Sequence, residues 1–256
     1  MDQQKHWDKI GAGYDSEIFD VFESDKLKKL PALFSKYENK THTSIDFGCG
    51  TGKALPYLSP AFKDVIAVDI SSELLNIAQQ RPHTNVTFRQ LDLTTSFKLG
   101  PADFAFCCNV IMLPDPAKNR AMLKNIRKSI KTGGSAVMVL PSLDSFFYSA
   151  MRMMEWYQRE GTKASDIIDE EFDGFKGSKR DIIQGLVSID GVKTKHYSLP
   201  ELELILPEAG FTINSIERLE YDWNTEFSKP PAWMKGPYPW DWVVDVGVSH
   251  QSLGKN

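Results

Sequence analysis

The central part of the chain, residues 44–140, alternates short apolar runs with segments of helical periodicity. The apolar runs have the length of strands and read TSIDFG, DVIAVDI, NVTFRQLDL, ADFAFCCNVIML and SAVMVLP. The helical patterns between them include KALPYLSPAF, SSELLNIAQQR and AKNRAMLKNIRKSI. Strands that alternate with helices form right-handed βαβ units, whose strands run parallel in one sheet. The pattern therefore predicts an α/β fold built on a parallel sheet.

The segments on either side of this core have different patterns. Helical periodicity dominates residues 1–40, which predicts an N-terminal helical cover. After Pro141, an aromatic helical segment leads into an acidic stretch and then into two extended runs around Asp190-Gly191, a dipeptide that favours a tight hairpin. We expect residues 142–197 to form a lid or insertion that includes this hairpin. One more helical pattern and two strands complete what we expect to be a single domain over residues 1–256.

The composition argues against several classes of partner. The formal net charge is -4 and the charges are mixed, so no basic surface for nucleic acid or anionic membranes is expected. Charged residues near Met1 predict no signal peptide, and no apolar run reaches bilayer length. The 3 cysteines lack metal-ligand spacing and an even count for a disulfide framework. We therefore expect a cytoplasmic protein without nucleic-acid, membrane or metal partners.

A glycine-rich stretch, SIDFGCGTGKALPYL, holds the strongest functional signal. Gly48, Gly50 and Gly52 stand at every second position between an apolar run and a helical pattern, and Asp46 lies two positions ahead of them. A carboxylate at Asp46 would repel a phosphate but would attract a ligand that carries an ammonium group. The stretch therefore favours a ligand with a cationic amino-acid tail.

Two other ligand classes fit the spacing less well. A phosphate-binding P-loop needs glycine at the position of Phe47 and a hydroxyl residue at the position of Ala54. A dinucleotide fingerprint needs its third glycine at the position of Lys53, and this departure weakens that interpretation without removing it.

The motif IDFGCGTG resembles the first motif of the class I S-adenosylmethionine-dependent methyltransferases. The segments VIAVDIS, RQLDL, ADFAFCCNVIMLPD, IRKSIKTGGSAVMV and HYSLPELELILPEAGFTINSIE resemble later parts of that family in order and spacing. The resemblance implies an enzyme with S-adenosylmethionine as cofactor. It also implies a Rossmann-like sandwich with helices on both faces of a seven-stranded, mostly parallel sheet, the last strand antiparallel, and a helical and hairpin insertion after strand five.

The same resemblance assigns roles to individual residues. It implies that Asp69 accepts the ribose hydroxyls, that Asp92 or its neighbour meets the adenine amino group, and that Asn109 ends the fourth strand. The N-terminal WDKIGAGYD is similar to the opening of the ubiquinone- and menaquinone-biosynthesis C-methyltransferase-like branch, which would place Tyr14 over the methionine end. Asp69 could instead belong to a helix cap beside Ser71. The implied cofactor-binding set is Tyr14, Asp46, Gly48, Cys49, Gly50, Gly52, Asp69, Ile70, Asp92, Leu93 and Asn109.

The methyl acceptor and the general base are less constrained by the sequence. Many relatives carry histidine near the positions of Ile111 and Met112, both apolar here, so the candidates for a base are His196 and Tyr14. We expect in-line methyl transfer to a small, partly apolar molecule. The alternatives are methylation of protein or tRNA, a non-catalytic cofactor-binding subunit, and a nicotinamide dehydrogenase. The predicted acceptor pocket contains Tyr14, Phe147, Trp156 and His196.

Overall fold

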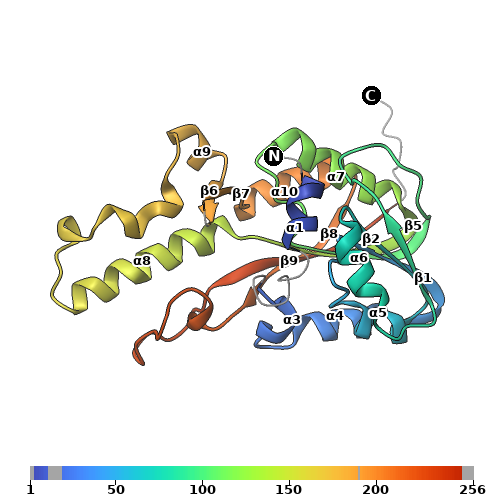
Figure 1. Cartoon of the computed structure of the whole chain (residues 1–256), viewed down its shortest axis with the longest axis horizontal. Helices are drawn as coiled ribbons and strands as arrows, with labels where there is room; N and C mark the ends of the chain where they lie inside the picture. The colour runs from blue at the N-terminus through green and yellow to red at the C-terminus, as the bar shows by residue number, and fades with distance from the viewer. Residues whose placement is uncertain (1–2, 11–18, 190, 250–256) are drawn as a thin grey trace.

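A seven-stranded sheet with the strand order β3-β2-β1-β4-β5-β9-β8 runs through the protein (Figure 1). The structure is a computed structural model and describes residues 3–10, 19–189 and 191–249. Neighbouring strands among the first five pair in parallel, whereas β9 pairs antiparallel with both β5 and β8. This topology confirms the predicted sheet, including the antiparallel last strand. The strands are β1 (Asn39–Phe47), β2 (Phe62–Asp69), β3 (Val86–Gln90), β4 (Ala102–Cys108), β5 (Ile130–Leu140), β8 (Thr212–Glu220) and β9 (Trp240–Gly247).

Helices cover both faces of the sheet, as predicted, and each face has its own hydrophobic core. One core contains apolar side chains of α3 (Val21–Ser24), α4 (Lys29–Tyr37), α5 (Leu55–Ala61) and α6 (Ser72–Gln79). The other contains those of α7 (Pro116–Lys128) and α10 (Leu199–Glu208).

Strand β5 shows why an apolar run, rather than an alternating one, marks a strand in this fold. Val137 and Val139 belong to the core under α4 and α5, whereas Ala136, Met138 and Leu140 belong to the core under α7 and α10. Successive side chains of a strand point to opposite faces. Because both faces are covered there, every position of β5 from Ala136 to Leu140 is apolar.

In the described part of the N-terminal segment, α1 (Gln3–Ile10) lies apart from α3 and α4 (Figure 1). Helix α1 contacts α6, and a hydrogen bond of 2.6 Å joins the Asp8 carboxylate to the Ser71 hydroxyl. The predicted cofactor cover Tyr14 lies outside the described residues.

The segment after β5 leaves the sheet as a long helix, α8 (Leu143–Arg159), which extends away from the core (Figure 1). It is followed by the 3-10 helices η2 (Ala164–Asp166) and η3 (Asp169–Phe175), by α9 (Lys179–Ile183), and by the hairpin of β6 (Leu186–Ile189) and β7 (Val192–Lys195), which forms its own two-stranded sheet. The connection from β8 to β9 contains η4 (Trp223–Thr225). Within the described ranges, no helix has both the length and the apolar character that a membrane span requires.

The base of the hairpin is tied to the loop after β4. The Lys195 backbone N–H donates to the Met112 carbonyl at 2.9 Å, and the Tyr197 hydroxyl donates to the Ile111 carbonyl at 2.8 Å. Tyr197 is 1% exposed, so its hydroxyl bond lies inside the core. The insertion therefore helps to hold the loop that follows the fourth strand.

Candidate functional site

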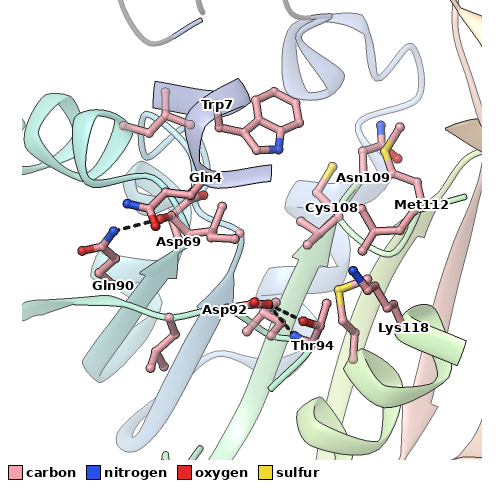
Figure 2. Close-up of a pocket in the computed structure, with 18 residues that line it drawn as sticks. Gln4, Trp7, Asp69, Gln90, Asp92, Thr94, Cys108, Asn109, Met112 and Lys118 are labelled. Atoms are coloured by element: carbon pink, nitrogen blue, oxygen red, sulfur yellow. Dashed lines mark hydrogen bonds between the residues drawn. The ribbon is translucent and has the colours of Figure 1, made fainter. Parts of the chain in front are cut away.

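A cavity of about 630 Å³ lies at the carboxyl ends of β2, β3 and β4 (Figure 2). This edge is where open α/β sheets bind their ligands. Side chains from α1, α6 and α7 complete its walls. The lining residues are Gln4, Trp7, Gly48, Asp69, Ile70, Leu74, Gln90, Leu91, Asp92, Leu93, Thr94, Cys108, Asn109, Val110, Met112, Leu113, Lys118 and Met122.

The glycine-rich turn after β1 brings its backbone to this cavity. Gly48 has a φ of +71°, and a Cβ atom at this position would come within 2.1 Å of Cγ2 of Val110. The backbone N–H groups of Gly48 and Cys49 donate to the Val68 carbonyl at 2.8 and 2.9 Å, which fixes the turn against β2. Glycine is therefore required at residue 48 both by the backbone angle and by the close approach of the β4 loop.

Asp69 links the end of β2 to the glycine turn. Its side chain is buried and borders the cavity, with one oxygen accepting the Gly50 N–H at 2.9 Å and the other accepting the Ser71 N–H at 2.9 Å. Helix α6 is capped by the Ser71 hydroxyl, so Asp69 is not its cap. Because a carboxylate can accept about four hydrogen bonds, both Asp69 oxygens retain capacity for a ligand.

Asp46 is a buried carboxyl group that forms no ion pair among the described residues. It is 2% exposed at the end of β1, and its Oδ2 atom has no hydrogen-bond partner in the part of the chain that the structure describes. Burial, and secondarily the charge of Asp69, raises the pKa of Asp46 to about 8. A cation beside this oxygen would satisfy it and favour its ionised form. The environment therefore suits an ammonium group.

Asn109 presents a second unsatisfied oxygen at the same edge. It follows β4 in the left-handed region with a φ of 52°, which asparagine tolerates better than most residues. Its Nδ2 donates to Asp241 at 3.3 Å, whereas its Oδ1 is buried and has no partner among the described residues. The Asn109 and Asp46 oxygens lie at the ends of neighbouring strands, β4 and β1, and both are acceptors.

Asp92 follows β3 and forms a local turn. Its Oδ1 atom accepts the backbone N–H of Thr94 at 2.8 Å and the Thr94 hydroxyl at 2.7 Å, as Figure 2 shows. The turn fixes the direction of the carboxylate, which borders the cavity. Its other oxygen makes no hydrogen bond within the described chain and can accept one from a ligand.

The predicted cofactor residues fall into two groups by position. The first group borders the cavity and contains Gly48, Asp69, Ile70, Asp92, Leu93 and Asn109. The second lies in the strand end and turn behind it and contains Asp46, Cys49, Gly50 and Gly52. The sequence interpretation did not assign Gln4, Trp7, Gln90, Thr94, Met112 and Lys118, which also line the cavity. Of these, only Trp7 had a signal, because it opens the WDKIGAGYD motif.

None of the described residues predicted to contact the acceptor borders this cavity. Phe147 is 45% exposed on α8, with its ring 5.4 Å from that of Phe175. The His196 ring lies 5.5 Å from that of Phe146, and burial lowers the pKa of His196 to about 4. Trp156 lines a different cavity farther along α8.

Comparisons with known proteins bear on the fold and on the class of enzyme. Residues 45–134 match the family model described as "Methyltransferase domain". The solved complex of DhpI with SAH has a TM-score of 0.62 at 15% identity and covers 96% of this chain and 95% of that chain. The N-methyltransferase NodS from Bradyrhizobium japonicum WM9, solved with S-adenosyl-l-homocysteine, has a TM-score of 0.59 at 12% identity and covers 96% and 98%. The chain has the Rossmann-like methyltransferase fold.

A shorter match exists to a yeast protein. The "Probable S-adenosylmethionine-dependent methyltransferase CRG1" of Saccharomyces cerevisiae is 39% identical over 69 residues, which is 27% of this chain. The match spans 22% of the yeast protein's own length, about a fifth. The family match and the methyltransferase fold both agree with the expected enzyme class and with the expected cofactor, S-adenosylmethionine.

Proposed function

We propose that the protein transfers a methyl group from S-adenosylmethionine to a small, partly apolar acceptor. The observation that carries this proposal is the unpaired oxygen of the buried Asp46, beside a glycine turn that Asp69 holds at the cavity. A buried carboxyl group without a partner is unfavourable, and an amino-acid ammonium would supply the partner. A pyrophosphate would not, because its negative charge is repelled by a carboxylate.

The residues of the cavity fit the parts of this cofactor. The free acceptor capacity of Asp69 suits the two ribose hydroxyls, and the second oxygen of Asp92 suits an amino group of the base. The Asp46 and Asn109 oxygens suit the ammonium. The indole of Trp7, on the α1 side of the cavity, offers an aromatic face to a sulfonium. Tyr14 remains a proposed cover for the methionine end.

The bound cofactor supplies an activated methyl group on a positively charged sulfur. The chain's task is then to hold the acceptor in line with that methyl group and to exclude water. Apolar side chains after β4, Val110, Met112 and Leu113, form the wall on the acceptor side, opposite α1. This wall matches the proposed apolar character of the acceptor and the likeness of WDKIGAGYD to the small-molecule C-methyltransferase-like branch.

A carboxylate near Asn109 can receive the proton that the acceptor loses. Asp241 is half-buried at the start of β9, and its Oδ2 accepts hydrogen bonds from Asn109 Nδ2 and, at 2.8 Å, from the Tyr221 hydroxyl. Burial raises the pKa of Asp241 to about 6, and these hydrogen bonds oppose that rise. A pKa in this range suits proton transfer at neutral pH. We therefore place Asp241, rather than His196, in this role.

The alternative of a protein or tRNA acceptor has less support. Such substrates favour a basic groove, whereas the chain has a net charge of -4 and an acidic stretch, SDIIDEEFD, in its insertion.

The direct test incubates the purified protein with donor labelled in the methyl group and three acceptor sets: small apolar molecules, protein extract and tRNA. We expect label in the small-molecule set and its loss with Asp69→Ala. Label in protein or tRNA alone would support the alternative. Cofactor binding without any label would support a non-catalytic subunit.

A further inference from the structure

A second cavity, of about 250 Å³, lies between α8, η3 and the β8–β9 connection. It is lined by Met153, Trp156, Tyr157, Glu160, Glu171, Glu226, Phe227 and Ser228. Its α8 residues, Met153, Trp156 and Tyr157, stand 10 to 14 positions after Leu143, which begins the helix at the sheet edge. At 1.5 Å per residue this places them roughly 15 to 21 Å along the helix. The second cavity is therefore separate from the cofactor site.

Aromatic rings form a corner of this cavity. The rings of Trp156 and Phe227 are 6.1 Å apart with an interplanar angle of 80°. Behind Phe227, the ring of Trp223 stacks at 5.6 Å and 15°, which holds the corner in place. The two rings meet edge to face and both residues line the cavity. The face of an aromatic ring attracts a cation, because it carries partial negative charge.

Three carboxylates surround the corner, and none of them forms an ion pair within the described ranges of the chain. Glu160 accepts the Trp156 indole N–H at 2.5 Å and Glu171 accepts the Tyr157 hydroxyl at 2.6 Å, so their partners are neutral. The nearby guanidinium groups of Arg152 and Arg159 pair with Glu155 instead. Glu160, Glu171 and Glu226 therefore line the cavity without a cation paired to any of them in the described chain.

The pKa values of two groups that line this cavity, Tyr157 and Glu226, are raised. The pKa of Tyr157 is raised, chiefly by its hydrogen bond to Glu171, and the charges of Glu171 and Glu160 add to the effect. The pKa of Glu226 is raised by desolvation of its carboxyl group, while Ser149 opposes the rise and Asp241 adds to it. The direction of the Tyr157 pKa shift reflects the carboxylates around the cavity, whose charge an added cation would offset.

We propose that this second cavity binds a small organic cation, an amine or a quaternary ammonium compound. An anion would be repelled by the three carboxylates, and a neutral apolar molecule would not use them. A bare metal ion fits poorly, since no group of three metal-binding side chains is close enough to hold one in the chain as described. The aromatic corner and the carboxylates together select a cation with an apolar surface.

The experiment titrates the full chain with choline in a calorimeter, at constant ionic strength, against 3,3-dimethylbutan-1-ol, its neutral isostere. We expect choline to bind with a dissociation constant on the order of 1 mM and the isostere at least about tenfold more weakly. Glu226→Gln and Trp156→Leu should each weaken choline binding about tenfold or more. The matched control is Glu170→Gln, which removes one charge from η3 outside the cavity and should leave binding unchanged.

Three results would overturn the proposal: no binding of choline to the wild type, equal binding of the isostere, or binding that survives in both cavity variants. Asp69→Ala separates this inference from the proposed function, since it should abolish cofactor binding and leave choline binding intact. Loss of choline binding in Asp69→Ala would place the cation in the first cavity and contradict a second site.

Discussion

At the scale of single residues, the site depends on carboxyl groups that differ in their partners. Asp69 is buried but accepts two backbone N–H groups, whereas the Oδ2 atom of Asp46 has no partner in the described chain. Burying Asp46 without a counter-charge destabilises the ligand-free protein. Such a residue stabilises the protein only when a cation binds beside it.

This contrast predicts that Asp46→Asn changes how the free energy of unfolding depends on pH. The folded-state pKa of about 8 lies above the unfolded value of 3.8, so the folded protein binds the extra proton between these values. The wild type should therefore lose unfolding free energy relative to the variant as pH rises from about 4 to about 8, by at most about 1.4 kcal/mol per pH unit. Urea unfolding of both proteins at several pH values measures this difference.

The same variant should bind S-adenosylmethionine at least about tenfold more weakly, because the ammonium loses its charged partner. A structural role for Asp46 predicts that stability and cofactor binding fall together. Our account predicts that Asp46→Asn raises the stability of the ligand-free protein at pH 8 while weakening cofactor binding. If the wild type and Asp46→Asn have equal free energies of unfolding at every pH, Asp46 is not the buried, unpaired carboxyl group described above.

Asp241 leads to a separate kinetic prediction. The carboxylate form, which accepts a proton, predominates above its pKa of about 6, so kcat for a proton-losing acceptor should rise with pH through that value. Asp241→Asn should remove this rise and lower kcat about 100-fold or more, with cofactor affinity unchanged. The control is Asp245→Asn on the same strand, where the carboxylate instead contacts Lys36 and Tyr37. An unaltered pH profile in Asp241→Asn would exclude Asp241 as the proton acceptor.

At the scale of elements, the proposed cofactor site depends most on the turn between β1 and α5, where the backbone at Gly48 lies against Val110 of the loop after β4. Two glycines with similar positive φ angles allow the effect of backbone strain on stability to be separated from the effect of a steric clash. Gly48 has a φ of +71° and no room for a Cβ atom, whereas Gly133 has a φ of +83° and nothing within 4 Å of such an atom.

Gly133→Ala should cost only the strain of a left-handed alanine, about 1 to 2 kcal/mol. Gly48→Ala adds a clash with Val110, so we expect a loss of at least about 3 kcal/mol, together with loss of cofactor binding. Thermal unfolding with and without cofactor measures both effects. Equal destabilisation by the two substitutions would show that the approach of Val110 to Gly48 is unimportant.

The elements also show which parts of the structure a sequence can reveal. The strands, the glycine turn and the carboxylates at strand ends follow from local patterns, because each depends on neighbours a few positions away. The aromatic corner does not, since it joins Trp156 of α8 to Phe227 of the β8–β9 connection. The environment of His196 is equally non-local, because Phe146, which packs on its ring, is about fifty positions away in the chain.

At the scale of the whole molecule, the proposed cofactor site and the insertion that borders the second cavity both start from the carboxyl edge of the sheet. The ends of β1, β2 and β3 carry the carboxylates of the proposed cofactor site, while Asn109 after β4 donates a hydrogen bond to Asp241 at the start of β9. The insertion extends from the same edge and, together with the β8–β9 connection, lines the separate second cavity. The proposed function depends on the cofactor site and not on the second cavity.

The most direct test is calorimetric titration of the wild type, Asp69→Ala and Asp64→Ala with S-adenosylmethionine. Asp64 is the matched control, because it is an exposed aspartate at the other end of β2, away from the cavity. We predict micromolar-range binding, on the order of 1 to 100 μM, by the wild type and Asp64→Ala, and at least about a hundredfold weaker binding by Asp69→Ala. Absence of binding by the wild type, or equal binding by all three proteins, would contradict the proposed cofactor site.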